Sequence, residues 1–310
     1  MKSNRFFLFT FLANFFYLCS CGPDGKPEPT DTPTSGDVNI VVDESYSLLF
    51  DTEINTFQAF YDLAHVHAKY LQENEALKMM LNDSCKVIVM NRDLSPEERT
   101  TFENNNIYPK STKIAEDAIA IVVNPENTDT IFTPSLFRSI LDGQDSLWSQ
   151  INAVSLLGRI NVVFDNKGSA NARYIQDSLM KGKTFSDHVF AVKSNPDVIE
   201  YVSQNKNAIG VLSVNWISDR DDSLSQNFLK KVKVVGMRTT EGGKAYKPFQ
   251  AYIKTKEYPF CRDVYMINRQ TRAGLGMGFV SYVASEKGQL IILKAGLIPA
   301  IASVRIIELK

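Results

Sequence analysis

Residues 86–98 of the chain, KVIVMNRDLSPEE, join an apolar run to the beginning of a helix. The run KVIVM (86–90) lacks polar alternation, which is typical of a strand buried on both faces of a sheet. Ser95, Pro96 and Glu98 then have the spacing of a helix N-cap, first position and third position, a capping box with proline at its start. A strand that passes through a polar turn into a helix is the unit from which α/β folds are built.

The same alternation continues on both sides of this unit. Apolar runs predict strands at 39–42, 66–71, 117–123, 160–164 and 208–214, and helical spacing predicts helices at 50–61, 73–81, 133–141, 172–180 and 195–205. Further strands are expected at 231–237, 250–255 and 289–294, a helix at 278–287 and an exposed loop at 218–227. The first three strands follow a βαβαβα order, which predicts a parallel sheet with crossover helices. A second set of strands after the first has ended indicates two lobes, with a ligand cleft between them.

The composition of the 310-residue chain is ordinary for a globular protein, with 44% hydrophobic and 22% charged residues. Its formal net charge of −1 excludes the global basic field that is typical of nucleic-acid-binding proteins. Any anionic ligand would therefore have to be held by a local binding site and not by the overall charge of the chain. We expect a monomer without a nucleic-acid partner.

The first 21 residues, MKSNRFFLFTFLANFFYLCSC, combine Lys2 and Arg5 with an aromatic-rich apolar run. This pattern predicts a signal peptide over residues 1–20. Its end, Leu18-Cys19-Ser20-Cys21, resembles the lipobox of bacterial lipoproteins, which implies cleavage before Cys21 and lipidation of that cysteine. Secretion with a free Cys21 thiol is the alternative.

A segment rich in proline and glycine follows the predicted cleavage site. GPDGKPEPTDTPTSGD (22–37) contains four prolines and three glycines, so residues 21–37 are predicted to be a disordered tether. The chain is then expected in the cell envelope, periplasm-facing or surface-exposed. A membrane would be contacted only through the lipid anchor.

No catalytic or metal-binding motif stands out in the body of the chain. Cys85 and Cys261 have no histidine nearby, and one disulfide or two free thiols both fit the sequence. His65 and His67 lie two apart, without an HExxH motif or a cysteine pair, and no GxSxG elbow is present. We therefore expect no enzyme, no metal and no cofactor, with an envelope hydrolase as the minor alternative.

Polar side chains cluster in the turns that join a predicted strand to a helix, at 43–45, 91–95 and 166–171. Free backbone N–H groups at a helix N-terminus hold anions without a large net charge, and the guanidinium groups of Arg92 and Arg173 match a tetrahedral oxyanion. The candidate ligand-binding residues are Glu44, Ser45, Arg92, Asp93, Asp117, Asn166, Gly168, Ser169, Asn171 and Arg173. The alternative is that the serines are only helix caps and that the arginines form surface ion pairs.

Several motifs occur in an order that resembles a known family. They are RDLSPEE (92–98), IAEDAIAIVVN (114–124), TPSLFRSILDGQDSLW (133–148), FDNKGSANARY (164–174), YPFCRDVYMI (258–267) and KGQLIILKAGLIPA (287–300). This order resembles the phosphate-binding component of bacterial phosphate ABC importers, which has a type II periplasmic-binding-protein fold. The resemblance implies lobes at 38–117 plus 250–310 and at 118–249, closing about segments near 117–123 and 242–255. It also implies phosphate or a related oxyanion as the ligand and an ABC permease as the partner.

The chain departs from the family pattern around the expected ligand. The arginine usual before the phosphate-loop glycine is absent, Arg173 stands one place later than the usual trailing arginine, and LQENEALK (71–78) replaces a Gly/Ser-rich loop. An envelope sensor or adhesive module without oxyanion affinity is therefore the alternative function. If an oxyanion binds, the carboxylates near the predicted junctions favour phosphate over fully ionised sulfate; these are Asp43, Asp93, Asp117 and Asp165.

Overall fold

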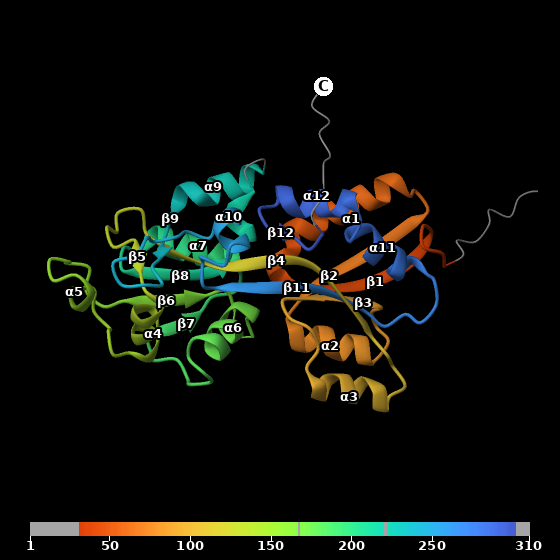
Figure 1. Ribbon diagram of the computed structural model, residues 1–310, viewed down its shortest axis with the longest axis horizontal. Coiled ribbons are helices and arrows are strands. Elements are labelled where there is room, and N and C mark those ends of the chain that lie inside the picture. Colours follow the sequence, from red (N-terminus) through yellow and green to blue (C-terminus); the bar gives the residue numbers. More distant parts are fainter. Residues whose placement is uncertain (1–30, 167, 220–221, 302–310) are drawn as a thin grey trace, which may run out of the picture. The chain divides into compact units, whose positions relative to one another are not determined.

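The structure of the chain, a computed structural model, describes residues 31–166, 168–219 and 222–301 (Figure 1). The predicted signal peptide, the predicted lipidation site Cys21 and residues 21–30 of the predicted tether lie outside these residues. The described residues belong to one compact unit that begins at Asp31. Every helix within them is too short or too polar to span a bilayer.

A mixed sheet runs through this unit, with its strands in the order β2-β1-β3-β11-β4-β8-β6-β7. These strands are β1 (Gly36–Asp43), β2 (Ala64–Leu71), β3 (Val87–Met90), β4 (Lys110–Val123), β6 (Asn161–Phe164), β7 (Val189–Ala191), β8 (Ala208–Ser213) and β11 (Cys261–Asn268). β1 is parallel to β2 and β3, and β6 is parallel to β7 and β8. β11 is antiparallel to β3 and β4, and β4 is antiparallel to β8. The predicted α/β class with a mixed sheet is confirmed.

Four shorter strands complete the pairing. β9 (Lys233–Val234) and β12 (Ile298–Pro299) pair with β4, and β5 (Ile131–Phe132) pairs with β10 (Gly236–Met237). The predicted strand at 231–237 is thus present as two short pieces.

Helices cover both faces of the sheet, as the sequence predicts. They are η1 (Glu44–Tyr46, a 3₁₀ turn), α1 (Ser47–Phe60), α2 (Glu73–Leu81), α3 (Pro96–Asn104), α4 (Pro134–Asp142), α5 (Trp148–Ile151), α6 (Ala170–Ser178), α7 (Asn195–Gln204), α8 (Asn215–Ser218), α9 (Ser223–Lys231), α10 (Gln250–Lys254), α11 (Leu275–Val283) and α12 (Glu286–Lys294). Around β1, helices α1 and α11 lie on one side of the strand, and α2 and α3 lie on the other (Figure 1).

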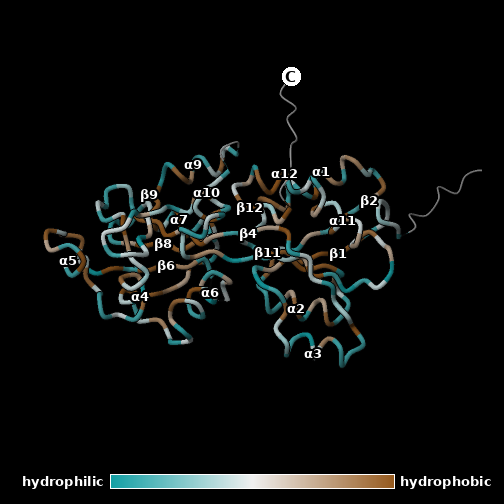
Figure 2. The backbone as a smooth tube through the Cα atoms, in the orientation of Figure 1, coloured by the Kyte–Doolittle hydropathy of each residue, from teal (hydrophilic) through white to brown (hydrophobic). Residues whose placement is uncertain are grey.

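The side-chain alternation of β1 explains this layering. Val38, Ile40 and Val42 point into one core with α1 and α11, whereas Val41 points into another core with α2 and α3. Both faces of the strand are therefore apolar, as the continuous apolar run predicts. The hydrophobic segments follow the strands, and the hydrophilic ones lie at the ends and outer sides of helices (Figure 2).

β4 is the strand that two cores share. Ile114 and Ala115 belong to the core around β1, and residues 118–123 belong to a third core around β6 and β8. The predicted lobe boundary at 117/118 falls between these two sets. The lobes themselves, 38–117 plus 250–310 and 118–249, remain a prediction.

Helix starts that carry a local capping signal are confirmed. The Ser95 hydroxyl accepts a hydrogen bond from the Glu98 N–H, and the Glu98 carboxylate accepts one from the Ser95 N–H, so the capping box is present. The Thr133 and Ser194 side chains cap α4 and α7 by accepting hydrogen bonds from the Leu136 and Asp197 N–H groups, each with a proline in the first turn. These signals act within four residues, so the sequence alone reveals them.

Three predictions on irregular or short segments are wrong. Residues 250–254 and 286–294 are helices α10 and α12, not strands, and the predicted loop at 218–227 contains the end of α8 and the beginning of α9. Short apolar runs such as QLIILK (289–294) do not distinguish a strand from a helix. The burial pattern in the folded chain distinguishes the two, because Ile292 is buried while Leu290 and Leu293 are exposed. The Asp222 side chain caps α9 by accepting from the Ser225 N–H, a signal that the sequence contains.

The end of the predicted tether is folded. Gly36 and Asp37 pair with Ala64 and His65 in the sheet, and the Asp31 carboxylate accepts a hydrogen bond from the Leu275 N–H at the start of α11. The tether prediction is therefore wrong for residues 31–37. Asp31 and Leu275 are more than two hundred positions apart, so local composition does not reveal contacts of this kind.

Candidate functional site

The ends of three strands carry the residues predicted to bind a ligand. β1 ends at Asp43, β3 is followed by Asn91 and Arg92, and β6 is followed by Asp165. In sheets of this kind, ligands bind outside the carboxyl ends of the strands. These strand ends are called corners below, and the hydrogen bonds of the candidate residues differ from one corner to the next.

At the corner after β1, Asp43 rather than Ser45 is the cap. The Asp43 Oδ1 accepts a hydrogen bond from the Ser45 N–H at 2.9 Å and so caps η1. Ser45 is 1% exposed, and its Oγ has no hydrogen-bond partner among the residues that the structure describes. The serine is therefore not a helix cap, and its hydroxyl is buried and available to a ligand.

At the corner after β6, Ser169 is the N-cap of α6. Its Oγ accepts hydrogen bonds from the N–H groups of Asn171 and Ala172 at 3.0 and 3.2 Å and donates to the Asp165 carboxylate. The Asn166 side chain accepts from the Gly168 N–H at 3.0 Å. A side chain on Gly168 would overlap the amide of Gln72, so the glycine permits a close approach to the segment between β2 and α2.

Asn171 lies in the first turn of α6 and is fully buried. Its amide nitrogen lies 3.5 Å from the Asn195 Oδ1, and the Asn195 amide donates to Asp165 at 3.3 Å. The Asn171 Oδ1 has no partner within the described part of the chain. Asn195 was not among the predicted residues, because only the fold brings the start of α7 to this corner.

A buried ion pair lies where β4 and β11 face each other. The Arg262 Nε and Nη2 donate to the Asp117 Oδ2 at 3.0 and 2.8 Å, and the hydroxyls of Tyr46 and Ser213 donate to the same oxygen at 3.1 and 3.0 Å. The Asp117 Oδ1 and the Arg262 Nη1 are buried and have no partner in the described residues. Burial of Tyr46 raises the pKa of its hydroxyl well above the ordinary value.

Arg262 is a further functional candidate that the sequence analysis missed. It stands directly opposite Asp117 in the antiparallel register of β11 and β4. No local pattern around Arg262 signals this pairing, since 145 positions separate the two residues.

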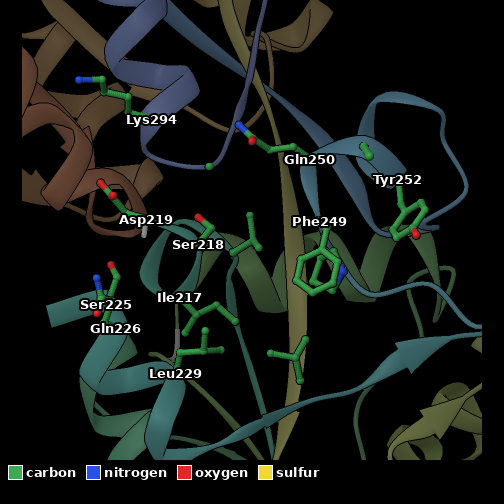
Figure 3. Close-up of a pocket in the computed structure, with 15 residues that line it drawn as sticks. Ile217, Ser218, Asp219, Ser225, Gln226, Leu229, Phe249, Gln250, Tyr252 and Lys294 are labelled. Carbon is green, nitrogen blue, oxygen red and sulfur yellow. The ribbon is translucent and has the colours of Figure 1, made fainter. Parts of the chain in front are cut away.

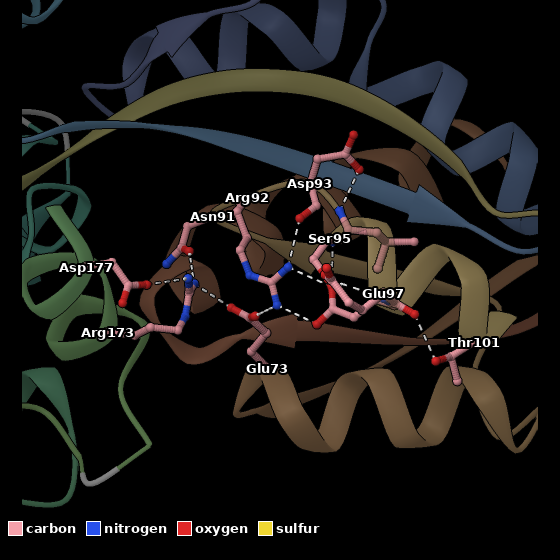
Figure 4. A network of polar contacts seen from close by, with 11 residues as sticks. Glu73, Asn91, Arg92, Asp93, Ser95, Glu97, Thr101, Arg173 and Asp177 are labelled. Carbon is pink, nitrogen blue, oxygen red and sulfur yellow. Dashed lines mark hydrogen bonds and ion pairs between the residues drawn. The ribbon is translucent and has the colours of Figure 1, made fainter. Parts of the chain in front are cut away.

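The two predicted arginines are both engaged by one carboxylate (Figure 4). The Arg173 Nη2 donates to Glu73 at 2.6 Å and to the Asn91 Oδ1 at 2.7 Å, and Arg92 forms ion pairs with Glu73 and, at 2.7 Å, with Glu98. The Glu73 carboxylate thus lies between the two guanidinium groups, where the sequence analysis expected an oxyanion. Glu73 belongs to LQENEALK, the segment that departs from the family pattern.

Asp93 is turned toward other partners. Its carboxylate accepts hydrogen bonds from Arg99 at 2.7 Å, from the Ser111 hydroxyl and from the Leu94 N–H. Burial acts to raise the Asp93 pKa, but these bonds and the ion pair with Arg99 together outweigh it and lower the pKa. The structure therefore gives Asp93 a role in holding α3 against β4.

Carboxylates from two corners influence each other. Burial, followed by the charges of Asp165 and Asp43, raises the pKa of Glu44 to about 7. Burial and the Asp43 charge raise the pKa of Asp165 to about 6, although hydrogen bonds from Ser169 and Asn171 oppose the shift. These carboxyls exchange protons with water near neutral pH.

A separate cavity of about 1040 Å³ lies between α8, α9, α10 and α12 (Figure 3). It is lined mainly by apolar side chains, among them Ile217, Leu229, Phe249 and Tyr252. None of the predicted ligand-binding residues lines it, so the candidate site at the strand ends and this cavity are distinct.

The chain is similar to known proteins along most of its length. A family model described as the PBP superfamily domain matches residues 27–287. The phosphate-binding protein PstS of Staphylococcus aureus (strain USA300) is 25% identical over 206 residues, which cover 64% of this chain and 58% of that protein. The chain thus spans less than two thirds of the length of the curated relatives that it matches.

Solved structures show the same fold. A putative phosphate ABC transporter substrate-binding protein from Clostridium perfringens, solved with bound phosphate, has a TM-score of 0.72 at 20% identity, covering 86% of this chain and 100% of that one. An ABC-type phosphate transport receptor from Vibrio cholerae has a TM-score of 0.65 at 19% identity and covers 85% and 100%. The OxyR2 regulatory domain from Vibrio vulnificus has a TM-score of 0.53 at 11% identity and covers 81% and 93%.

Proposed function

Because the chain belongs to the PBP superfamily and has the type II periplasmic-binding-protein fold, we propose that it captures phosphate for an ABC importer and performs no chemistry on it. The phosphate would bind at the ends of β1, β3 and β6, beside the Asp117–Arg262 pair. Closure of the two predicted lobes about β4 and the segment 242–255 would then enclose the ion.

One observation carries this proposal. Three buried donor atoms have no hydrogen-bond partner among the described residues: the Ser45 Oγ, the Asn91 Nδ2 and the Arg262 Nη1. An unpaired buried donor costs about 1–3 kcal/mol, so such groups at a strand end need an explanation. A tetrahedral oxyanion offers acceptors to several converging donors at once, and a guanidinium group suits its geometry.

Selectivity for phosphate over sulfate follows from the neighbouring carboxylates. The Asp117 Oδ1 is buried without a donor in the part of the chain described, and it could accept a hydrogen bond from a protonated phosphate oxygen. Sulfate has no proton to donate at neutral pH, so it would meet only repulsion there.

Calorimetric titration tests the proposal. The chain from Gly22 onward, stripped of bound anions by unfolding and refolding, should bind phosphate one-to-one and should not bind sulfate. If neither anion binds to the refolded protein, phosphate capture is ruled out, and the sensor or adhesive module becomes the leading function.

The sensor alternative rests on one specific contact. Glu73 already neutralises Arg92 and Arg173, which leaves fewer free cations for an anion. The OxyR2 regulatory domain also has this fold without being named as a transport protein.

Replacing Glu73 by glutamine should strengthen phosphate binding by about tenfold, a change of about 1.4 kcal/mol. The substitution removes a negative charge and leaves Arg173, whose Nη2 lies 2.6 Å from Glu73, without that ion pair, while Arg92 keeps its ion pair with Glu98. Titration of the variant measures the effect. Glu75→Gln, an exposed change on the same helix, is the matched control and should leave the affinity unchanged. Weaker binding by Glu73→Gln would contradict this role of Glu73.

We further propose that Cys21 anchors the mature chain through a lipid and that the chain acts as a monomer beside an ABC permease. The lipobox resemblance supports the anchor. Mass spectrometry of the mature N-terminus checks it, since an unmodified Cys21 would remove the anchor from the proposal.

A further inference from the structure

The apolar cavity between α8, α9, α10 and α12, called the α9–α10 groove below, has a buried floor and exposed walls. Buried residues form the floor, among them Val214, Ile217 and Val234. Leu229 of α9 and Phe249 at the N-cap of α10 stand on different sides of the groove (Figure 3) and are 46% and 52% exposed. Large apolar side chains that remain exposed over an apolar hollow are typical of an interaction surface.

Hydrogen bonds hold the walls of the groove in place. The Gln250 side chain donates to the carbonyl oxygens of Leu293 and Leu297 at 2.8 Å each, which fixes the start of α10 against the end of α12. The Ser218 hydroxyl donates to the Ala295 carbonyl oxygen at 2.7 Å, which fixes the end of α8 to the same place. The groove is therefore a preformed feature of the fold.

One buried polar group of the groove has no partner. Ser225 lines the groove and is 1% exposed, and its Oγ forms no hydrogen bond within the described residues. Its N–H is already engaged, because it donates to the Asp222 carboxylate at 2.7 Å. An occupant that brings a hydrogen-bonding group to this hydroxyl would satisfy it.

The charged side chains around the groove are mainly cationic. The two carboxylates there, Asp219 and Asp222, accept backbone hydrogen bonds at the start of α9 at 3.2 and 2.7 Å. Four exposed lysines lie on or directly beside segments that line the groove, and they form no ion pair within the described residues: Lys230, Lys247, Lys254 and Lys294. Charge complementarity therefore favours an acidic occupant over a basic one.

The size and the walls of the groove favour a protein segment over a small molecule. Its volume of about 1040 Å³ reaches the upper end of the range of about 300–1,000 Å³ that is usual for small-molecule sites. Its walls are helices, and the groove is open where Leu229 and Phe249 are exposed. An amphipathic helix binds to such a groove by inserting apolar side chains at positions i, i+3, i+4 and i+7.

We propose that the α9–α10 groove binds an acidic amphipathic helix of a partner protein. Apolar side chains of that helix pack between Leu229 and Phe249, and its carboxylates pair with Lys294 and the neighbouring lysines. The groove shares no residue with the candidate phosphate site. The proposal therefore goes beyond phosphate capture and does not depend on it.

Fluorescence anisotropy with a labelled, stapled helical peptide tests the proposal on the chain from Gly22 onward. The peptide carries leucines at i, i+3, i+4 and i+7 and glutamates on the opposite face, and a second peptide has lysines in place of the glutamates. The glutamate peptide should bind at least about tenfold more tightly than the lysine peptide. This preference should shrink at high salt, because the lysines and the peptide carboxylates are exposed to solvent.

Variants of the groove locate the binding. Leu229→Ala and Phe249→Ala should each weaken binding of the glutamate peptide by about tenfold, because each removes an apolar anchor. Lys294→Glu should weaken binding of the glutamate peptide and strengthen binding of the lysine peptide. Leu63→Ala and Lys69→Glu change exposed residues beside and within β2. They are the matched controls and should leave both affinities unchanged.

Several results would overturn the proposal. They are no binding of the glutamate peptide to the parent chain, equal or tighter binding of the lysine peptide, and parental affinity in both Leu229→Ala and Phe249→Ala. A concentration-dependent dimer in ultracentrifugation that Leu229→Ala abolishes would assign the groove to a second copy of the chain. Binding of dodecyl maltoside in place of the peptide would assign it to a small amphiphile. The comparison of the two peptides needs only the parent chain, so it decides the matter even if a variant does not fold.

Discussion

Replacement of Asp117 by asparagine should lower the free energy of unfolding by about 3–5 kcal/mol, because it leaves the buried Arg262 charge without its partner. The side chains of Asp117 and Arg262 are 0% and 2% exposed, and one Asp117 oxygen accepts hydrogen bonds from Arg262, Tyr46 and Ser213. The pair also links β4 to β11 at the boundary between the core around β1 and the core around β6 and β8. Urea unfolding followed by circular dichroism measures the effect.

The neighbouring residue provides the control. Glu116 pairs with Lys113 and Lys256 in partly exposed positions, so Glu116→Gln should cost at most about 1 kcal/mol. The double variant Asp117→Asn/Arg262→Met should recover part of the loss, because an apolar residue then replaces the unpaired cation. A loss below 1 kcal/mol in Asp117→Asn would show that water reaches this pair and that it is not buried in solution.

Glu53→Gln should remove a strong pH dependence of stability. Glu53 is fully buried on the core side of α1, both of its carboxylate oxygens lack partners among the described residues, and burial raises its pKa to about 9. In the unfolded chain the carboxyl ionises at its ordinary value of 4.5. Between these values the folded state holds one more proton than the unfolded state. Stability therefore falls by about 1.4 kcal/mol per pH unit as pH rises from about 5 to about 9.

Unfolding free energies at pH 5, 7 and 9 check this slope. The parent chain should lose stability across the series through this group, and Glu53→Gln and Glu53→Met should both be flatter by about 1.4 kcal/mol per unit. Glu75→Gln, an exposed change on α2, should retain the parental slope. Parallel curves for the parent and both Glu53 variants would mean that Glu53 is ionised and solvated in the native state.

The sequence indicated several candidate donors and acceptors at the strand ends, but not the side chains that they contact. Ser45, Asn171 and Arg173 were candidates from the sequence, since polar residues after an apolar run signal a strand end, and Asp117 was a candidate as a carboxylate near the predicted junctions. Ser169 was also a candidate, and the structure gives it the capping role that was its alternative. Glu73, Asn195 and Arg262 were missed. The first two stand in segments whose local pattern predicts only a helix, and no element was predicted around Arg262, which lies in β11.

By itself, the sequence determined the features that depend on near neighbours. The strand at 87–90 and the capping box at Ser95 arise from residues a few positions apart, and so do most other helices and strands. The tertiary structure alone decided which charges meet. Glu73 and Arg173 are 100 positions apart, and Asp117 and Arg262 are 145 apart. Whether a carboxylate is neutralised by an arginine or left in a cluster such as Asp43, Glu44 and Asp165 depends on distance and burial, because Coulomb energies are set by separation in space and by the local dielectric.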